Sequence, residues 1–280
     1  MTANADFPGP GPGAAGTGQV LAAGKTLSVV IPAYNESKRI GRTFREIRSW
    51  LDEHFKSRYE VVLVDDGSRD QTAELVAEEA GRWPELRLLR QPRNLGKGAA
   101  VRRGCLDARH DYVLFMDADH ATPIEELRAF FPKLEEGYNV IAGVRTFQES
   151  ESRNRRIIGL SLLILAHLFV FTKAVVDSQC GFKLFKREVC RDIFSRCRID
   201  GGMIDVEILH LAHRLNVPIW YAPVYWGNKA GSTINVLRCM INDPFDLLAI
   251  RLRSLWGTYA KPLVRQPWEK GRGARGKGGA

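Results

Sequence analysis

Two aspartates stand one residue apart directly after a short apolar run, and this pairing constrains the fold more than any other feature. The run Tyr112–Met116 has the composition of a buried strand, Asp117 and Asp119 follow it, and a helix start signal begins at Thr122. In an open parallel sheet, ligands bind beyond the carboxyl ends of the strands. The pair therefore offers hard oxygen ligands for Mg²⁺ or Mn²⁺ bridging a diphosphate, although two solvated acids in a loop would give the same pattern.

Strands and helices alternate through the first half of the chain. Apolar runs of strand length occur at Leu27–Pro32, Glu60–Asp65, Leu86–Leu89 and Asn139–Gly143. After the first run, apolar residues repeat at helical spacing from Ile40 to Leu51. This order predicts an α/β fold with a mostly parallel, doubly wound sheet, so that the loops after the strands meet at one edge. Those loops contain Tyr34, Asp66, Lys97 and Asp117.

The segment Gly96–Gly98 reads Gly-Lys-Gly and precedes a helix that the pattern extends to about Arg109. Glycines let a backbone approach a phosphate closely, and a helix N-terminus beside Lys97 supplies positive potential. The spacing is neither that of a dinucleotide-binding fold nor that of a P-loop, since Val101 stands where a third glycine would be. The segment therefore disfavours a dinucleotide-dependent oxidoreductase and leaves phosphate binding open.

Composition narrows the class of partner. The chain has 280 residues, 45% of them hydrophobic, so it can bury a full core in one large domain. Its formal net charge of +9 predicts an anionic partner, and because no nucleic-acid recognition motif accompanies the charge, phosphate ligands and acidic lipid are favoured over nucleic acid. The five cysteines are scattered and lack a Cys-x-x-Cys pair, which indicates reduced thiols rather than disulfides or a zinc site.

The two ends of the chain differ in composition from the part between them. Residues 1–24 are rich in Gly, Pro and Ala and lack the features of a secretory signal, so they are interpreted as a disordered tail. Residues 265–280 are Gly-rich and basic, which predicts a second disordered tail that could touch anionic lipid.

Two segments in the second half favour contact with a membrane surface. Residues 157–172 are apolar with basic flanks but shorter than the roughly 20 residues that span a bilayer. They would form a helix in the membrane interface, a buried core helix or a marginal transmembrane span. Pro244–Tyr259 places large apolar residues on one stripe and Arg251 and Arg253 elsewhere, a pattern typical of a basic amphipathic helix and also of a core-packing one.

Two polar segments complete the second half. Asp177–Phe185 predicts a polar turn that leads into a strand containing Lys183. Gly201–Glu207 leads into a helix, where Asp205 and Glu207 could be ordinary N-terminal acids or part of a site.

With these segments in order, the chain resembles the family 2 glycosyltransferases of the GT-A fold, and within them the polyprenyl-phosphate sugar transferases. The dolichyl-phosphate glucosyl branch is nearest and the mannosyl branch is next. The resemblance covers about residues 27–260, and the matching segments are Val29–Glu36, Val64–Ser68, Asn94–Gly98, Asp117–Asp119, Gln179–Phe185, Asp205–Glu207 and Asp246–Arg253.

The resemblance implies roles for residues at the expected sheet edge. The base and ribose of a nucleotide-sugar donor would be held by Pro32, Ala33, Tyr34 and Glu36. Asp66 would accept a hydrogen bond from the base, and Lys97 would face the nucleotide. The metal, Mg²⁺ or Mn²⁺, would be carried by Asp117 and Asp119.

The resemblance also implies a catalytic group and an acceptor site. The expected catalytic residues are Asp119, Asp205, Arg145 and Lys183, and of these Arg145 and Lys183 would help to neutralise the donor and acceptor phosphates. The phosphate of a polyprenyl-phosphate acceptor would be met by Arg145 and Arg156, with Arg155 as the alternative to Arg156.

Two positions depart from the pattern of the family. The mannosyl relatives carry a glutamine two residues after the second acid, where this chain has Ala121, so a third protein ligand is missing or His120 replaces it. The glucosyl relatives carry Arg-Trp-Ala-Phe-Asp where Gly201–Asp205 stand, so the contacts to the sugar or acceptor would differ there.

The implied reaction is inverting transfer of glucose from UDP-glucose to the phosphate of a polyprenol, at the cytoplasmic face of a membrane that the protein binds peripherally. The alternatives are transfer from GDP-mannose, transfer to a non-lipid acceptor, and a membrane-docked nucleotide-binding scaffold without turnover. A sugar nucleotidyltransferase is disfavoured because its glycine-rich signature with arginine is absent after the first strand. The expected organisation is a GT-A domain over residues 25–240 and an amphipathic helical segment over 241–264, between the two tails.

Overall fold

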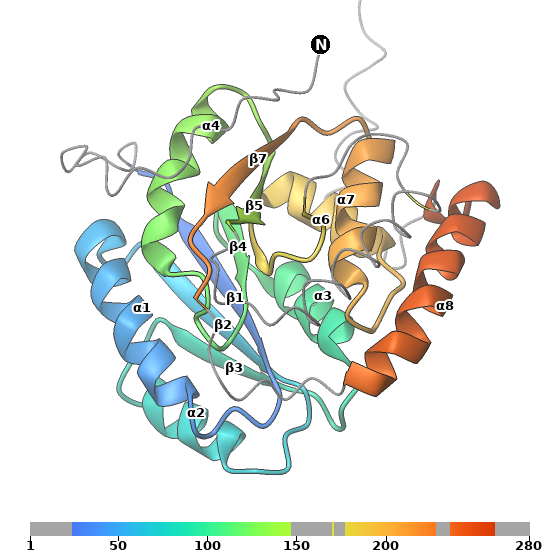
Figure 1. Ribbon diagram of the computed structural model, residues 1–280. Helices are drawn as coiled ribbons and strands as arrows, with labels where there is room; N and C mark the ends of the chain where they lie inside the picture. Colours follow the sequence, from blue (N-terminus) through green and yellow to red (C-terminus); the bar gives the residue numbers. More distant parts are fainter. Residues whose placement is uncertain (1–23, 147–169, 171–176, 228–235, 261–280) are drawn as a thin grey trace, which may run out of the picture.

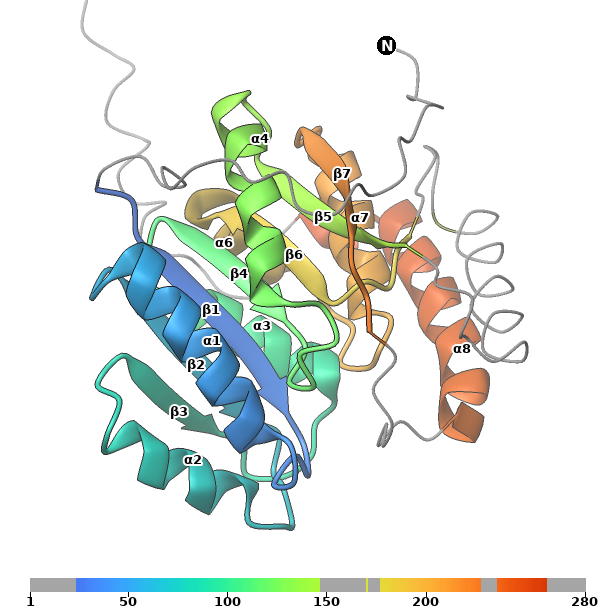
Figure 2. The same cartoon turned by 60° about the vertical axis from the view of Figure 1, so that its left-hand side comes forward.

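The apolar runs of the sequence form one seven-stranded sheet. The computed structural model describes residues 24–146, 170, 177–227 and 236–260, and Figures 1 and 2 show the sheet with helices on both faces. The strands run in the spatial order β3-β2-β1-β4-β6-β5-β7. They are β1 (Leu27–Ala33), β2 (Tyr59–Asp65), β3 (Leu86–Arg90), β4 (Tyr112–Met116), β5 (Val140–Arg145), β6 (Phe182–Lys186) and β7 (Ile219–Val224).

The sheet is parallel except for β6, which runs antiparallel to both of its neighbours, β4 and β5. Ala33 pairs with Asp65, and Met116 pairs with Phe182. The carboxyl ends of β1, β2 and β4 and the amino end of β6 therefore lie at the same edge. This arrangement confirms the expected mostly parallel, doubly wound α/β fold.

The helices cover the sheet on both sides. One face carries α1, α2 and α4, and the other carries α3, α6 and α7, with α8 on the outside (Figures 1 and 2). The helices are α1 (Ile40–Phe55), α2 (Thr72–Ala80), α3 (Lys97–Asp107), α4 (Phe131–Glu135), α6 (Arg187–Arg196), α7 (Ile204–Arg214) and α8 (Val236–Leu255), with 3₁₀ turns η1 (Ile124–Ala129) and η2 (Thr258–Ala260).

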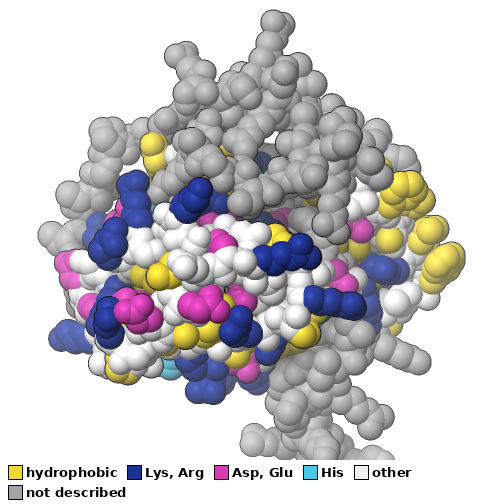
Figure 3. Space-filling view, turned by 90° about the horizontal axis from the view of Figure 1, so that it is seen from below, with side chains coloured by type: hydrophobic (Ala, Val, Ile, Leu, Met, Phe, Trp, Pro, Cys, Tyr) yellow, Lys and Arg dark blue, Asp and Glu magenta, His cyan; other side chains and the backbone are white. Residues whose placement is uncertain are grey.

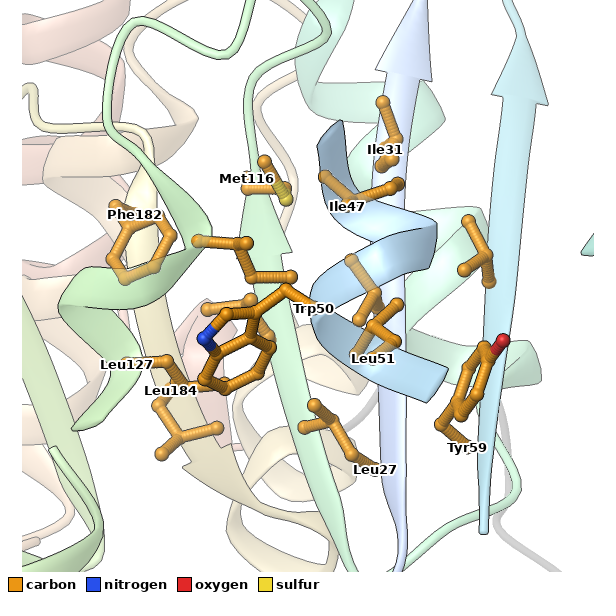
Figure 4. Close-up of a cluster of buried hydrophobic side chains, with 14 of the residues drawn as sticks. Leu27, Ile31, Ile47, Trp50, Leu51, Tyr59, Met116, Leu127, Phe182 and Leu184 are labelled. Atoms are coloured by element: carbon orange, nitrogen blue, oxygen red, sulfur yellow. The ribbon is translucent and has the colours of Figure 1, made fainter. Parts of the chain in front are cut away.

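Alternate residues of the strands supply two hydrophobic cores. Val29 and Ile31 of β1 pack in the core under α1, whereas Val30 packs in the core under α3. Figure 4 shows the first core, to which Trp50 of α1 and Leu184 of β6 both belong. Strands buried on both faces explain why β1, β2 and β4 appear in the sequence as continuous apolar runs rather than alternating ones.

The helix expected after Thr122 is instead a 3₁₀ turn, η1, which begins at Ile124. No side-chain cap of the predicted kind is made there. The amide of Ile124 donates to Nε2 of His120 at 3.1 Å. The imidazole of His120, and not the side chain of Thr122, therefore caps this 3₁₀ turn.

The C-terminal helix begins eight residues before Pro244, where the sequence pattern predicted its start, and it ends at Leu255 rather than Tyr259. Pro244 therefore lies inside α8, where its missing N–H removes one helical hydrogen bond. None of the helices in the described ranges is both long enough and apolar enough to cross a membrane. Apart from Val170, the apolar segment 157–172 lies outside the described residues, as do both predicted tails except Gly24.

Candidate active site

Charged side chains from four elements meet at the edge where β4 ends. Nζ of Lys97, the first residue of α3, lies 3.0 Å from Oδ1 of Asp117 and 3.1 Å from Oδ2 of Asp205. Nζ of Lys183 on β6 lies 2.6 Å from Oδ1 of the same Asp205. All four loops expected to converge are joined by contacts: Lys97 reaches Asp117, and the amide of Gly96 donates to Asp66. The loop of Tyr34 contacts that of Asp66 through the amide of Asn35, which donates to Oγ of Ser68, and the start of α7 joins the group through Asp205.

The Lys183–Asp205 ion pair forms the buried floor of this cluster. The Lys183 side chain is 0% exposed, and its ammonium also donates to the carbonyl of Cys180. Asp205 accepts from both lysines with separate oxygens, so neither buried charge lacks a partner. Lys183 was expected to neutralise a substrate phosphate, but its ammonium here faces Asp205 and lies below the surface.

The cluster changes the proton affinities of its members. Burial acts to raise the pKa of Asp205, but Lys183 and Lys97 outweigh it and hold that pKa below its usual value. Burial acts to lower the pKa of Lys97, but Asp117 and Asp205 together raise it. Lys97 and Asp205 are therefore charged at neutral pH. Burial, assisted by Asp205 and Asp119, raises the pKa of Asp117 despite the opposing effect of Lys97.

The Asp117 carboxylate rests against the backbone of Gly181. A Cβ atom at Gly181 would overlap all three atoms of that carboxylate, so a side chain there would displace the carboxylate from its position. The amide of Asp117 donates to the carbonyl of Gly181 at 3.1 Å, which extends the β4–β6 pairing by one residue. The Asp117 side chain is nevertheless 41% exposed and can accept a ligand from solvent.

Asp119 and His120 form the turn that follows Asp117. Oδ1 of Asp119 accepts a hydrogen bond from the amide of Ala121 at 3.0 Å, and the side chain is partly exposed. Nδ1 of His120 lies 2.6 Å from Oε2 of Glu46 on α1, while its Nε2 accepts from Ile124. Both ring nitrogens are occupied, so the suggestion that His120 replaces a missing third metal ligand is wrong for this structure.

Within the described ranges, no group of three or more His, Cys, Asp or Glu side chains is arranged to hold a metal ion. Asp117 and Asp119 are hard oxygen donors of the type that Mg²⁺ and Mn²⁺ prefer, and they are partly open to solvent. The two carboxylates thus fit a divalent ion, for which the part of the chain that the structure describes offers no third carboxylate, imidazole or thiolate ligand beside them.

The glycines beside Lys97 approach protein backbone rather than an open phosphate site. The amides of Gly98 and Ala99 donate to the carbonyl of Asp200, at 2.7 and 3.3 Å. A Cβ at Gly96 or Gly98 would collide with the backbone of residues 199–201. The α3 N-terminus is therefore capped by the loop before α7, and this packing places Lys97 next to Asp205.

Asp66, expected to accept from a nucleotide base, already accepts three hydrogen bonds. Oδ1 accepts from Nε2 of Gln91 at 2.7 Å and from the amide of Leu95 at 2.8 Å, and Oδ2 accepts from the amide of Gly96 at 2.9 Å. Burial raises the pKa of Asp66 although these donors act in the opposite direction. Oδ2 retains one lone pair for a base, so the assigned role stays a prediction.

The loop after β1 contains the other residues expected to bind the nucleotide. Glu36 is buried and accepts from Nε and Nη2 of Arg39, each at 2.8 Å, while its amide donates to Thr72 at 2.8 Å. Ala33 is buried, and Pro32 and Tyr34 are partly exposed at the sheet edge. This loop is held by internal contacts in a position that leaves Tyr34 accessible, and its role in nucleotide binding stays a prediction.

Arg145 at the end of β5 pairs with Asp177, a partner that the sequence did not suggest. Nε and Nη2 of Arg145 contact the two oxygens of Asp177 at 2.8 and 3.0 Å. Burial acts to raise the pKa of Asp177, but the guanidinium outweighs it and holds the pKa below its usual value. Arg155 and Arg156, the other expected phosphate ligands, lie outside the described residues.

Glu207 is a buried structural acid rather than a simple helix N-terminal one. Its carboxylate accepts from the amides of Arg198 and Ile199 at 2.9 Å and from the hydroxyl of Tyr259 at 2.7 Å. It therefore joins α7 to the loop before it and to the C-terminal 3₁₀ turn. Its place two residues after Asp205 was the only signal in the sequence, and it did not reveal these partners.

Comparison with known proteins shows the protein family to which the chain belongs. Residues 28–194, more than half of the chain, match the profile of glycosyl transferase family 2. The chain belongs to this family, as the resemblance of its strand-and-loop segments suggested.

The similarity to individual proteins extends further along the chain. A dolichyl-phosphate beta-glucosyltransferase of Dictyostelium discoideum is 37% identical over 248 residues, which cover 83% of this chain and 76% of the relative. The human protein of the same name is 35% identical over 262 residues, covering 86% and 80%. The Saccharomyces cerevisiae protein is 35% identical over 254 residues, covering 83% and 76%.

Solved structures agree on the fold. Mannosyl-3-phosphoglycerate synthase from Rubrobacter xylanophilus superposes with a TM-score of 0.62 at 21% identity, covering 88% of this chain and 78% of that one. Glucosyl-3-phosphoglycerate synthase from Mycobacterium tuberculosis, crystallised with Mn²⁺, UDP-glucose and phosphoglyceric acid, gives a TM-score of 0.59 at 24% identity, covering 82% and 80%. These neighbours confirm the expected GT-A fold.

Proposed function

We propose that this protein transfers glucose from UDP-glucose to the phosphate of a polyprenol such as dolichyl phosphate, with inversion at the sugar carbon. The observation that carries the proposal is the 35–37% identity to curated dolichyl-phosphate beta-glucosyltransferases over at least 83% of the chain. Nucleotide-sugar-dependent transfer follows from the family, whereas the sugar, the nucleotide and the lipid acceptor are inferred from these relatives.

The donor would bind where Lys97, Asp117 and Asp119 meet the end of β4. Asp117 and Asp119 would hold Mg²⁺ or Mn²⁺, and the solved neighbour that contains Mn²⁺ with UDP-glucose supports a divalent ion in this fold. When bound, the metal would neutralise charge on the departing diphosphate. Because the side chain of Ala121 has no ligand atom and both ring nitrogens of His120 are hydrogen-bonded, diphosphate oxygens and water would complete the coordination.

The acceptor phosphate needs little help from a base. A phosphate monoester has a second pKa of about 6, so the acceptor is mostly a dianion at neutral pH. Asp205 is bound to two lysines and its pKa is lowered, so its role would be to orient Lys97 rather than to take a proton. Lys97 would then stabilise the diphosphate in the transition state by its fixed positive charge.

A lipid acceptor requires that the protein reach a membrane surface. The outward side of α8 and the residue after it carry an apolar stripe formed by Phe245, Leu248, Leu255 and Trp256, which we name the outer stripe. Phe245 is 68% exposed and Trp256 is 76% exposed. Figure 3 shows hydrophobic side chains gathered at the right-hand edge of that view, on the side where α8 lies. We infer that this stripe enters the interfacial region of the bilayer.

The test is a transfer assay with purified protein, radiolabelled UDP-glucose, a polyprenyl phosphate and Mg²⁺, in which a lipid-linked sugar should form. Asp119→Ala should retain its fold and lose activity by orders of magnitude, whereas Glu53→Gln, at an exposed position of α1, should leave turnover unchanged. Unchanged turnover in Asp119→Ala would remove its proposed metal role.

Donor and acceptor exchange separates the alternatives. GDP-mannose in place of UDP-glucose tests the mannosyl activity, and 3-phosphoglycerate in place of the polyprenyl phosphate tests a soluble acceptor of the kind named for the solved neighbours. Nucleotide binding without transfer to any acceptor would indicate the scaffold instead.

A further inference from the structure

His120 adopts a backbone conformation that residues other than glycine rarely take. Its φ is 52°, in the left-handed region, and it lies between Asp119 and Ala121 in the turn after β4. Its ring is buried and bonded at both nitrogens, to Glu46 and to the amide of Ile124. Because Nε2 accepts from an N–H group, Nδ1 carries the proton and donates to Glu46.

The same face of α1 holds this turn at two points. Oγ1 of Thr43 donates to the carbonyl of Ala118 at 2.8 Å, and Glu46, three residues later, contacts His120 at 2.6 Å. Nε of Arg42 donates to the other oxygen of Glu46, also at 2.6 Å, which fixes the Glu46 carboxylate. The turn that contains Asp119 is thus fastened to a helix whose opposite end is anchored in the core.

The left-handed conformation of His120 determines where the Asp119 carboxylate lies. Oδ1 of Asp119 accepts from the amide of Ala121, two residues on, which is an Asx turn with His120 as its central residue. A change of φ at His120 would turn the Ala121 amide relative to the Asp119 carboxylate, so the present direction of this hydrogen bond depends on the left-handed conformation.

We propose that His120 is a positioning residue for Asp119: its two ring contacts hold the turn in the conformation that aims the Asp119 carboxylate. The proposal rests on the proposed function, in which Asp119 contacts the metal of the donor complex. Groups that orient a metal ligand typically change metal affinity or activity by about tenfold to a hundredfold when removed.

The test compares three variants with the wild type. His120→Gly keeps the left-handed conformation accessible but removes both ring contacts. Asparagine at this position also tolerates that conformation. In His120→Asn, the side-chain amide N–H can take the place of the Nδ1–H of His120 and donate to Glu46. Lys56→Gly is the matched control, because Lys56 has a φ of 49° and is exposed at the far end of α1.

Three quantities are measured for each protein: Mn²⁺ affinity in the presence of UDP by electron paramagnetic resonance, kcat and KM for transfer, and the thermal midpoint. We expect His120→Gly to weaken Mn²⁺ binding and lower kcat by about tenfold or more each, with little change in the KM for the lipid. His120→Asn should recover most of both losses, and Lys56→Gly should match the wild type.

The outcomes distinguish this proposal from the one on which it rests. A wild-type protein that neither binds Mn²⁺ with UDP nor transfers sugar would overturn both. An active wild type whose His120→Gly variant matches it in Mn²⁺ affinity and kcat would overturn the positioning role alone. If His120→Gly does not fold, Glu46→Ala removes the same contact from the helix side and should weaken Mn²⁺ binding in the same direction; unchanged binding there overturns the role as well.

Discussion

The ammonium of Lys97 lies 3.0 Å from a carboxylate oxygen of Asp117 and occupies the side of Asp117 that faces Asp205. Together with Lys183, these residues form a cluster of two positive and two negative charges. The formal charges of these four side chains sum to zero before any ligand binds. A divalent ion approaching Asp117 without a diphosphate would therefore meet a carboxylate that is already neutralised, whereas a metal–diphosphate complex brings its own counter-charge.

Lys97→Met should separate metal binding from catalysis. Removing the ammonium leaves Asp117 unneutralised, so the affinity for Mn²⁺ alone should rise on the order of tenfold, while transfer from UDP-glucose should fall by a similar factor or more. Mn²⁺ titration by electron paramagnetic resonance without nucleotide measures the first effect. Lys97→Arg, which keeps the charge, should bind free Mn²⁺ as weakly as the wild type. Equal or weaker Mn²⁺ binding by Lys97→Met would contradict this account.

Gly181→Ala should damage the site more than the fold. The added methyl group would occupy the space of the Asp117 carboxylate, and that carboxylate can move outward because it is the free end of a side chain. We expect activity to fall by about a hundredfold with only a small loss in thermal midpoint. Gly202→Ala is the matched control, since a Cβ there meets nothing within 4 Å. A Gly181→Ala variant as active as Gly202→Ala would show that the position of Asp117 is not critical.

The alternation of apolar runs and helical periods was sufficient to predict the fold, because strands buried on both faces and amphipathic helices leave direct marks in the sequence. Two elements were misjudged for local reasons. η1 is capped by the ring of His120 and not by Thr122, and α8 continues through Pro244. Both depend on tertiary contacts or context that outweigh the usual meaning of Thr-Pro and of an internal proline.

The site was predictable where the strand ends determine it and unpredictable where partners come from distant segments. The topology alone was enough to predict that Asp117 and Lys97 lie close together. The pairing of Arg145 with Asp177 and of His120 with Glu46 joins residues 32 and 74 positions apart, with no motif connecting them. The glycines around Lys97 show a related limit, because glycine indicates close approach but not whether protein backbone or phosphate approaches.

Asp243, a buried acid of α8, should make the free energy of unfolding depend on pH. Burial and the neighbouring Asp246 raise the pKa of Asp243 to about 6, compared with 3.8 for the free side chain. Between these values the folded form holds a proton that the unfolded chain releases, so this group favours folding at low pH, and that contribution is lost as the pH rises through 6.

Asp243→Asn should therefore increase the free energy of unfolding at pH 8 by about 3 kcal/mol and have little effect near pH 4. Urea denaturation at the two pH values measures the difference. Glu53→Gln changes the same charge at a position whose side chain is 74% exposed and should alter neither value. If Asp243→Asn lowered stability at pH 8, the carboxylate would have to be charged and paired in the folded protein.

The outer stripe of α8 should be required for membrane binding and not for folding. The inward side of α8 contributes Leu247 and Ile250 to the core, so replacing Phe245 and Trp256 on the outward side leaves that packing intact. Moving one large apolar side chain out of water contributes about 1.5–3 kcal/mol, so Phe245→Ser with Trp256→Ser should weaken binding to anionic vesicles at least tenfold.

Vesicle co-sedimentation measures this binding, and transfer to a short-chain, water-soluble polyprenyl phosphate checks that the active site remains intact. Leu75→Ser is the matched control because Leu75 on α2 is also an exposed apolar residue, on the opposite side of the sheet from α8. Its vesicle binding should equal that of the wild type. Wild-type binding by the double variant would place the membrane contact elsewhere in the chain, whereas lost transfer to the short acceptor would mean that α8 also supports the site directly.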